Sequence, residues 1–130
     1  MFDFNDKLTR QICNTLLRLG IPPHILGYGY LVCAIRMVAN DPSYLREITK
    51  RLYPDVAAEN GTTPQRVERA IRNAVEIGFS RCKIDDLNRF FGTTVMQSKG
   101  KLTNSEFIAI VAQRITFEIS PLMETQYKEG

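Results

Sequence analysis

Apolar residues recur along most of the chain at spacings of three and four residues, which is the period of an amphipathic α-helix. The first apolar stripe contains Leu8, Ile12, Leu16 and Leu19. Gly20 and the Ile-Pro-Pro sequence after it end this predicted helix. Similar stripes over 28–38 and 45–52 predict two more helices, and no segment alternates regularly enough to predict a sheet. The pattern therefore predicts an all-α fold.

Turn and cap residues indicate where the middle helices begin and end. Residues 40–43 (Asn-Asp-Pro-Ser) form a predicted turn with a ready N-cap. Pro54 fits only near the start of a new short helix, which Gly61 ends. Thr63 is the predicted N-cap of the next helix, with Pro64 at its first position.

The last third of the chain carries the same kind of signal. Asp85 is the predicted N-cap of a short helix that Gly92 closes. Residues 93–96 are predicted to be briefly extended. Thr103, Asn104, Ser105 and Glu106 form a capping box that opens a last helix.

Length and composition place the chain among ordinary globular domains. Its 130 residues are 44% hydrophobic and 24% charged, which is enough apolar content for one core. Without an internal repeat or a long linker, we expect a single domain over 1–130, with 120–130 as a frayed tail. No apolar run reaches the roughly 18 residues of a membrane span, and the acidic N-terminus is not typical of a signal peptide. The three cysteines lie far apart, so we expect reduced thiols in a cytoplasmic protein.

Motifs for catalysis or cofactor binding are scarce. His24 is the single histidine, and no nearby residue could join it in a metal site or in activating a nucleophile. Residues 27–29 (Gly-Tyr-Gly) lack the third glycine and the preceding strand of a dinucleotide-binding fingerprint, and no Walker loop is present. We therefore expect no enzyme activity, no cofactor and no metal.

Positive charge is concentrated in one contiguous part of the chain. Residues 66–101 hold eight basic and four acidic residues, a net charge of +4, and the remainder holds nine basic and ten acidic residues, or −1. A basic patch on a near-neutral body is typical of a nucleic-acid-binding protein, although solvated helix faces can also be basic. Within this part we expect Lys83, Lys99 and Lys101 to contact DNA phosphates.

Residues 53–72 have the spacing of a helix-turn-helix unit. Ala57 is small enough for the second helix to cross closely over the first, Gly61 permits a left-handed turn residue, and Val67 packs the second helix on the core. Asn60 is less typical, because that position is usually apolar. A unit of this kind places its second helix in the major groove of double-stranded DNA.

The second helix of this unit has two distinct faces. Val67, Ile71, Ala74 and Gly78 fall on one side. The opposite side carries Gln65, Arg69, Arg72 and Glu76, flanked by Arg66, Glu68 and Asn73. Arginine can pair with guanine, asparagine or glutamine with adenine, and glutamate with cytosine, so these seven residues are candidate base contacts. The alternative is a solvated helix stabilised by Glu68–Arg72 and Arg72–Glu76 pairs.

A single small module reads only a few base pairs, so we expect two copies to bind DNA together. In the last helix the predicted inward stripe contains Phe107, Ile108, Val111 and Ile115. Ile110 and Phe117 point partly elsewhere and are candidates for contact with a second copy. The alternative is that the first helix covers both.

Several segments together resemble a known family. ITKRLYPDVA (48–57), TTPQRVERAIRNAVEIGFSR (62–81), FFGTTV (90–95), KGKLTNSEFIAIVA (99–112) and LGIPPHILGYGYL (19–31) are similar to the C-terminal effector domain of the sporulation response regulator, stage-zero sporulation protein A. The resemblance covers roughly residues 8–119. It implies a six-helix domain that binds a short DNA box near sporulation promoters through the helix beginning at Thr63. It further implies contact between 84–96 and an RNA polymerase sigma factor, and dimer contacts by the last helix on tandem boxes.

The sequence also departs from the family pattern. Pro64, Gln65 and Asn73 stand where Ala, Ser and His are expected, and Thr93 and Leu102 replace an expected Tyr and Pro. The phosphoacceptor receiver domain that normally precedes this domain is not within the 130 residues. An alternative function is a protein-interaction module of the same ancestry, which modulates a full-length regulator or RNA polymerase without binding DNA. Such a module would be expected to lose its exposed arginines, yet Arg66, Arg69 and Arg72 are present.

Overall fold

The computed structural model describes the backbone of residues 4–92 and 102–129, and the side chains of 6–92 and 102–118. This described part is helical, without a strand, so the prediction of an all-α fold is confirmed. Its elements are α1 (Phe4–Arg18), α2 (Leu26–Asn40), the 3₁₀ turn η1 (Pro42–Arg46), the π turn η2 (Ile48–Leu52), α3 (Tyr53–Asn60), α4 (Pro64–Arg81), α5 (Ile84–Phe91) and α7 (Asn104–Glu129).

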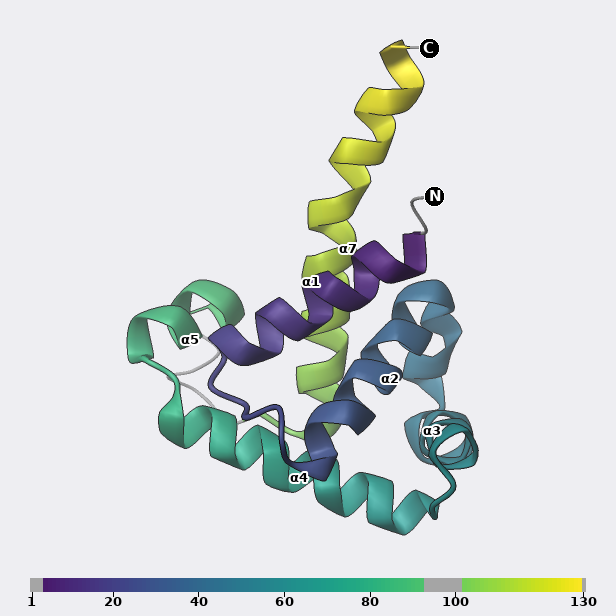
Figure 1. The fold of residues 1–130 in the computed structure, drawn as a ribbon, viewed down its shortest axis with the longest axis vertical. Helices are drawn as coiled ribbons and strands as arrows, with labels where there is room; N and C mark the ends of the chain where they lie inside the picture. Colours follow the sequence, from purple (N-terminus) through teal and green to yellow (C-terminus); the bar gives the residue numbers. More distant parts are fainter. Residues whose placement is uncertain (1–3, 93–101, 130) are drawn as a thin grey trace.

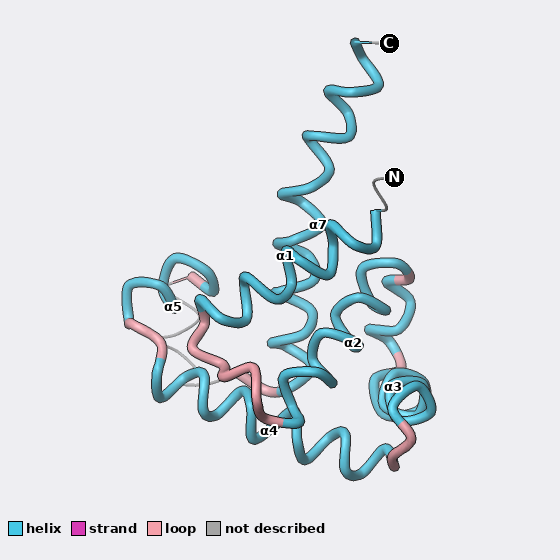
Figure 2. The backbone as a smooth tube through the Cα atoms, in the orientation of Figure 1, coloured by secondary structure: helices cyan, strands magenta, loops and turns pink. Residues whose placement is uncertain are grey.

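Helix α2 lies at the centre of the fold. It contacts α1, α3, α4 and α7, and its buried residues form the middle of one continuous apolar core. Figure 1 shows α4 running along one edge of the molecule, while α1 crosses α7 on the opposite side of α2. The connections from α3 to α4 (61–63) and from α4 to α5 (82–83) are short loops, drawn in pink in Figure 2. Helix α4 is therefore supported from behind by the core and open on its other face.

Most of the predicted helix ends are confirmed by hydrogen bonds. At the start of α7 the Thr103 N–H donates to Glu106 Oε1 at 3.1 Å, and the Glu106 N–H donates to Thr103 Oγ1 at 3.2 Å. This reciprocal pair is the predicted capping box. Asp41 caps η1 by accepting the Ser43 N–H at 3.1 Å.

One predicted cap is wrong. Helix α5 begins two residues earlier than expected, at Ile84, with Lys83 at the N-cap and no side-chain cap. Asp85 instead lies in the first turn, where its negative charge is still favourable near the helix N-terminus. Gly92 ends the helix as expected, with a left-handed φ of 89° and its N–H bonded to the Asn88 carbonyl at 2.8 Å.

The chain between α2 and α3 also differs from the prediction. In place of one helix over 45–52, η1 is followed by η2, which runs directly into α3. The N–H groups of Leu52 and Tyr53 bond to carbonyls five residues back, those of Glu47 and Ile48. Pro54 explains this difference, because it has no N–H to donate and its ring crowds the carbonyl four residues before it. Pro54 itself lies in the first turn of α3, as predicted.

The expected tail over 120–130 falls largely within the last helix of the structure. The backbone of α7 continues through residues 120–129, so this segment is helical in the structure. This stretch combines helix formers such as Leu, Met, Glu, Gln and Lys with Pro121, which has no N–H to donate to the carbonyl four residues before it. The predicted extended segment 93–96 lies outside the described residues. No helix in the described ranges is long and apolar enough to span a membrane.

Candidate nucleic-acid interface

Helix α4 presents a continuous polar face to solvent. Its buried residues are Val67, Ile71, Ala74, Val75 and Gly78. Its exposed residues include Gln65, Arg66, Arg69, Arg72, Asn73 and Glu76, and Glu68 is half-buried beside them. The prediction of a two-faced helix is confirmed, and the structure brings all seven candidate base contacts onto or beside one face.

The start of α4 is fixed by its connection to α3, which is only three residues long. Gly61 adopts the left-handed conformation (φ 64°, ψ 39°), which costs glycine little. The Thr62 N–H donates to the Ala57 carbonyl at 3.0 Å, and Thr63 Oγ1 accepts the Arg66 N–H at 3.3 Å. These bonds hold the first turn of α4 in a fixed relation to the end of α3.

Behind the polar face, two glycines allow close approach to α4. A Cβ added to Gly27 of α2 would lie 2.7 Å from Ala74 Cβ and closer still to the Ala70 carbonyl oxygen. A Cβ added to Gly78 would lie 2.9 Å from Ile21 Cγ1. Both distances are shorter than a normal van der Waals contact. Helix α4 therefore lies closer to α2 and to the α1–α2 loop than any larger residue would permit.

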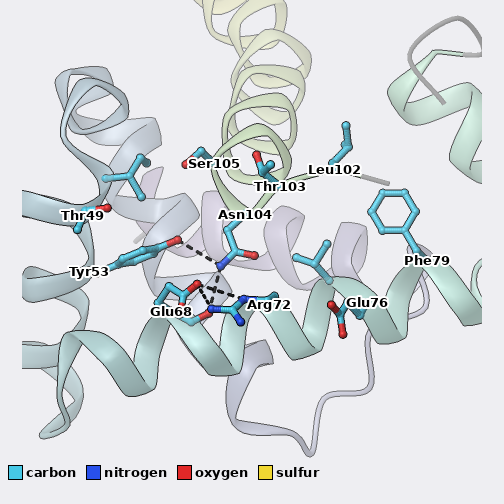
Figure 3. Close-up of a pocket in the computed structure, with 12 residues that line it drawn as sticks. Thr49, Tyr53, Glu68, Arg72, Glu76, Phe79, Leu102, Thr103, Asn104 and Ser105 are labelled. Atoms are coloured by element: carbon cyan, nitrogen blue, oxygen red, sulfur yellow. Dashed lines mark hydrogen bonds and ion pairs between the residues drawn. The ribbon is translucent and has the colours of Figure 1, made fainter. Parts of the chain in front are cut away.

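One edge of the polar face borders a hollow of about 610 Å³ (Figure 3). The hollow is also lined by η2, by Tyr53 of α3 and by the first turn of α7. Glu68, Arg72 and Glu76 lie on the α4 side of it. These three residues are thus at the border of the polar face, while the helical repeat places Arg69 near its middle.

Glu68 and Arg72 form an ion pair one helical turn apart, as Figure 3 shows. Arg72 Nε donates to Glu68 Oε1 at 3.1 Å, and Arg72 Nη2 donates to the same oxygen. This hydrogen bond and the charge of Glu68 raise the pKa of the Arg72 guanidinium further above its ordinary value, with a smaller contribution from Glu76. This is one of the two ion pairs that would stabilise α4 as a solvated helix, the alternative interpretation of its polar face.

Asn104 connects α7 to the second turn of α4, a contact that the sequence did not reveal. Its Nδ2 donates to the Glu68 carbonyl at 3.1 Å and to Tyr53 Oη at 3.2 Å (Figure 3). Tyr53 is buried, and burial is the main cause that raises the pKa of its hydroxyl. One side-chain amide therefore joins α3, α4 and α7 at the edge of the polar face.

Removal of the Asn104 amide is expected to lower the stability of the domain. In Asn104→Ala, two hydrogen bonds are lost and the partly buried Tyr53 hydroxyl loses its donor, which should cost about 1–2 kcal/mol of unfolding free energy. Ser105→Ala is the matched control, because Ser105 is exposed in the same helical turn. Urea unfolding followed by circular dichroism measures both variants. Equal unfolding midpoints for the two variants would show that the Asn104 contacts do not stabilise the fold.

The basic residues around α4 differ in how they are held. Within the described residues, neither Arg66 nor Arg69 has a salt-bridge partner, whereas Arg72 is paired with Glu68. Lys83 is exposed just after α4. The other two candidate phosphate contacts, Lys99 and Lys101, lie outside the described residues. Arg66 and Arg69 are therefore the cations of the polar face that are not engaged by a described carboxylate.

Comparison with family models identifies the protein family of this chain. The family model of the sporulation initiation factor Spo0A C terminal matches residues 12–115, which is most of the chain from α1 into α7. The chain belongs to this family. Spo0A C-terminal domains are DNA-binding regulatory domains, so the match agrees with the resemblance found in the sequence segments. Among the described residues, no three His, Cys, Asp or Glu side chains are arranged to hold a metal ion.

Proposed function

We propose that this Spo0A-family domain is a sequence-specific transcription regulator that reads the major groove of double-stranded DNA at sporulation-type promoters. The observation that carries the proposal is the exposed face of α4, on which two arginines without a described salt-bridge partner lie beside two amide side chains. Helices α3 and α4 would act as the helix-turn-helix unit. The core behind α4 supports this use, because a recognition helix must enter the groove without deforming.

The side chains of this face suit different bases. Arg69 and Arg66 can each pair with guanine O6 and N7, and Gln65 and Asn73 can pair with adenine. Glu68 and Glu76 can accept a hydrogen bond from cytosine N4. Because Arg72 is already held by Glu68, we assign it a supporting role, in which it orients the Glu68 carboxylate or contacts a phosphate.

Selection from a randomised duplex library tests this function directly. The wild-type chain is used to enrich a duplex, and fluorescence anisotropy then compares the selected duplex with a scrambled one of equal composition at several salt concentrations. A sequence-specific regulator should bind the selected duplex about 10³-fold tighter or more. Failure to enrich any sequence, or equal affinity for both duplexes, would favour the protein-interaction module instead.

Phosphate contacts are expected to change salt dependence without changing sequence preference. In Lys83→Ala, one counterion fewer is released on binding, so the fall of log K with log salt concentration should become less steep by about 0.9. The ratio of affinities for the selected and scrambled duplexes should stay unchanged. Lys99→Ala and Lys101→Ala are expected to behave in the same way. Anisotropy titrations at four or more salt concentrations give the slopes. A wild-type slope in all three variants would place these lysines away from the DNA.

We further propose that two copies bind tandem boxes cooperatively through α7. Phe117 supports this, because 74% of its surface is exposed, so α1 does not cover it as the alternative supposed. Ile110 is partly buried against the core and is the weaker candidate.

Spacing of the boxes tests cooperative binding. Moving two boxes apart by about 5 base pairs places the copies on opposite faces of the duplex. The binding isotherm should then lose its cooperativity, while single-box affinity stays the same. Identical isotherms for the original and the spaced probes would contradict a dimer on DNA.

The short helix α5 is the proposed contact for an RNA polymerase sigma factor. Ile84 exposes 74% of its surface at the start of α5, and such an exposed apolar side chain suits a protein contact. Phe91, near the other end of α5, is instead buried and packs against Phe79 and Phe107. The proposed contact over 84–96 extends beyond the described residues at 93–96.

A further inference from the structure

The last turn of α3 is bound to α2 through both oxygens of one carboxylate. Arg36 Nη2 donates to Glu59 Oε1 at 2.7 Å, and Cys33 Sγ donates to Glu59 Oε2 at 3.1 Å. Cys33 and Arg36 are three residues apart on α2 and therefore lie on the same side of that helix. Two donors on separate oxygens fix the plane of the carboxylate as well as its position.

Local helix energetics do not explain a glutamate at position 59. The C-terminal end of a helix carries partial negative charge, so a carboxylate in the last turn is unfavourable. Asp55, in the first turn of the same helix, lies where a negative charge is favoured. The contacts that stabilise the Glu59 carboxylate in the last turn of α3 therefore come from α2.

Cys33 acts in this cluster as a buried hydrogen-bond donor. Only 5% of its surface is exposed. Burial and the neighbouring Glu59 carboxylate raise the pKa of its thiol to about 12, so it stays protonated and can donate near neutral pH. This environment disfavours the thiolate that metal binding or nucleophilic chemistry would need.

The first turn of α4 depends on the end of α3 more than the rest of α4 does. The contacts made through Gly27, Gly78 and Asn104 all reach α4 at residue 68 or beyond. The turn before them follows Glu59 after only a short connection through Gly61. Gln65 and Arg66 lie in this turn. A shift at the end of α3 would therefore move Gln65 and Arg66 relative to the rest of the polar face.

From this geometry we infer that Glu59 is a positioning residue for DNA recognition: its contacts with Cys33 and Arg36 set the orientation in which α4 presents its first turn to the bases. The inference rests on the proposed function of α4. It assigns Glu59 no contact with DNA. Its effect should appear in sequence discrimination, because displaced side chains lose base contacts while phosphate contacts tolerate small shifts.

Three variants separate positioning from simple charge effects. Glu59→Ala removes both contacts, and Glu59→Gln keeps an oxygen for Arg36 at nearly the same volume. Asp55→Ala is the matched control, since Asp55 is an exposed carboxylate on the same helix whose described hydrogen bond, from Tyr44 Oη at 2.6 Å, comes from η1 and not from α2. All are compared by anisotropy at one salt concentration, on the duplex selected by wild type and on its scrambled counterpart.

We expect Glu59→Ala to weaken binding to the selected duplex roughly 2- to 30-fold, which is the range of coupling through packed neighbours. Binding to the scrambled duplex should stay equal or tighten, because a negative charge has been removed. Glu59→Gln should lose less affinity for the selected duplex. Asp55→Ala should keep the wild-type ratio of affinities for the selected and scrambled duplexes. An unchanged ratio in Glu59→Ala, or equal tightening of both duplexes by the Ala and Gln variants, would overturn the inference.

Amide hydrogen exchange in the DNA-free protein gives a second readout, independent of DNA binding. The Arg66 and Val67 amides bond to the Thr63 side chain and carbonyl, so they report on the first turn of α4. Both should exchange faster in Glu59→Ala than in wild type or Asp55→Ala. Unchanged exchange at both amides overturns the inference. If wild type does not discriminate between the duplexes, the proposed function fails, and this exchange result alone decides whether Glu59 positions α4. Should Glu59→Ala not fold, Glu59→Gln carries the same test with a smaller expected change.

Discussion

Arg69→Ala should lower affinity for the selected duplex by roughly 5- to 150-fold, equivalent to about 1–3 kcal/mol, and relax discrimination at one base pair. Arg69 is near the middle of the exposed face of α4 and has no salt-bridge partner among the described residues. Its guanidinium is therefore available for a two-bond contact with guanine. Anisotropy on the selected duplex and on its single-base variants measures both the loss and its position.

Two controls distinguish base reading from charge. Arg69→Lys keeps the positive charge but cannot form the planar two-bond contact, so it should lose discrimination almost as completely as the alanine variant. Arg10→Ala removes the same charge from an exposed position on α1 and should leave the selected-to-scrambled ratio unchanged. If Arg69→Lys restores wild-type binding and discrimination, Arg69 is a phosphate contact.

Gly27→Ala should strongly lower the unfolding free energy of the domain, because it adds a methyl group where α2 and α4 meet. The added Cβ would collide with the backbone carbonyl of Ala70 and with Ala74, so α2 and α4 would have to separate. Such overpacking lowers the unfolding free energy by about 1–3 kcal/mol. The better helix propensity of alanine offsets about 1 kcal/mol of this loss at most. Urea unfolding should therefore show a lower midpoint with an unchanged m value.

Gly29→Ala is a closely matched control for this prediction. Gly29 lies two residues further along α2, is exposed, and has no atom within 4 Å of an added Cβ. The same substitution there should raise stability by about 0.5–1 kcal/mol, because alanine favours the helix and restricts the unfolded chain. Destabilisation of both variants to the same extent would mean that the close approach at Gly27 is not the cause.

The sequence predicted those features of the fold that depend on local signals. The apolar period located the helices, and Thr63, Gly61 and the capping box behave as their side chains suggest. The two faces of α4 follow from the same period. For this reason the composition of the polar face could be predicted before its surroundings were known.

Features that depend on distant residues could not be predicted in this way. Gly27 was considered only as part of an incomplete nucleotide-binding motif, because nothing in its neighbours shows that α4 will cross there. Asn104 belongs to a capping box in sequence, yet its amide reaches Glu68, 36 residues away. The N-cap of α5 was misassigned by two residues, to Asp85 in place of Lys83, since several neighbouring residues could start a helix. The apolar stripe before Pro54 predicted a regular helix there. Prediction of the π turn would have needed the missing N–H of Pro54 to outweigh that stripe.

The length of α7 gives the Asn104 contact a mechanical consequence. At 1.5 Å per residue, the 26 residues of α7 extend about 39 Å from the end that is bound to α4. For a straight helix of this length, a rotation of about 5° at the Asn104 end would displace the last residue by roughly 3 Å. Figure 1 shows that far end projecting past the other helices. Under the proposed function, a spectroscopic label attached there would report movements of α7 that accompany DNA binding by α4.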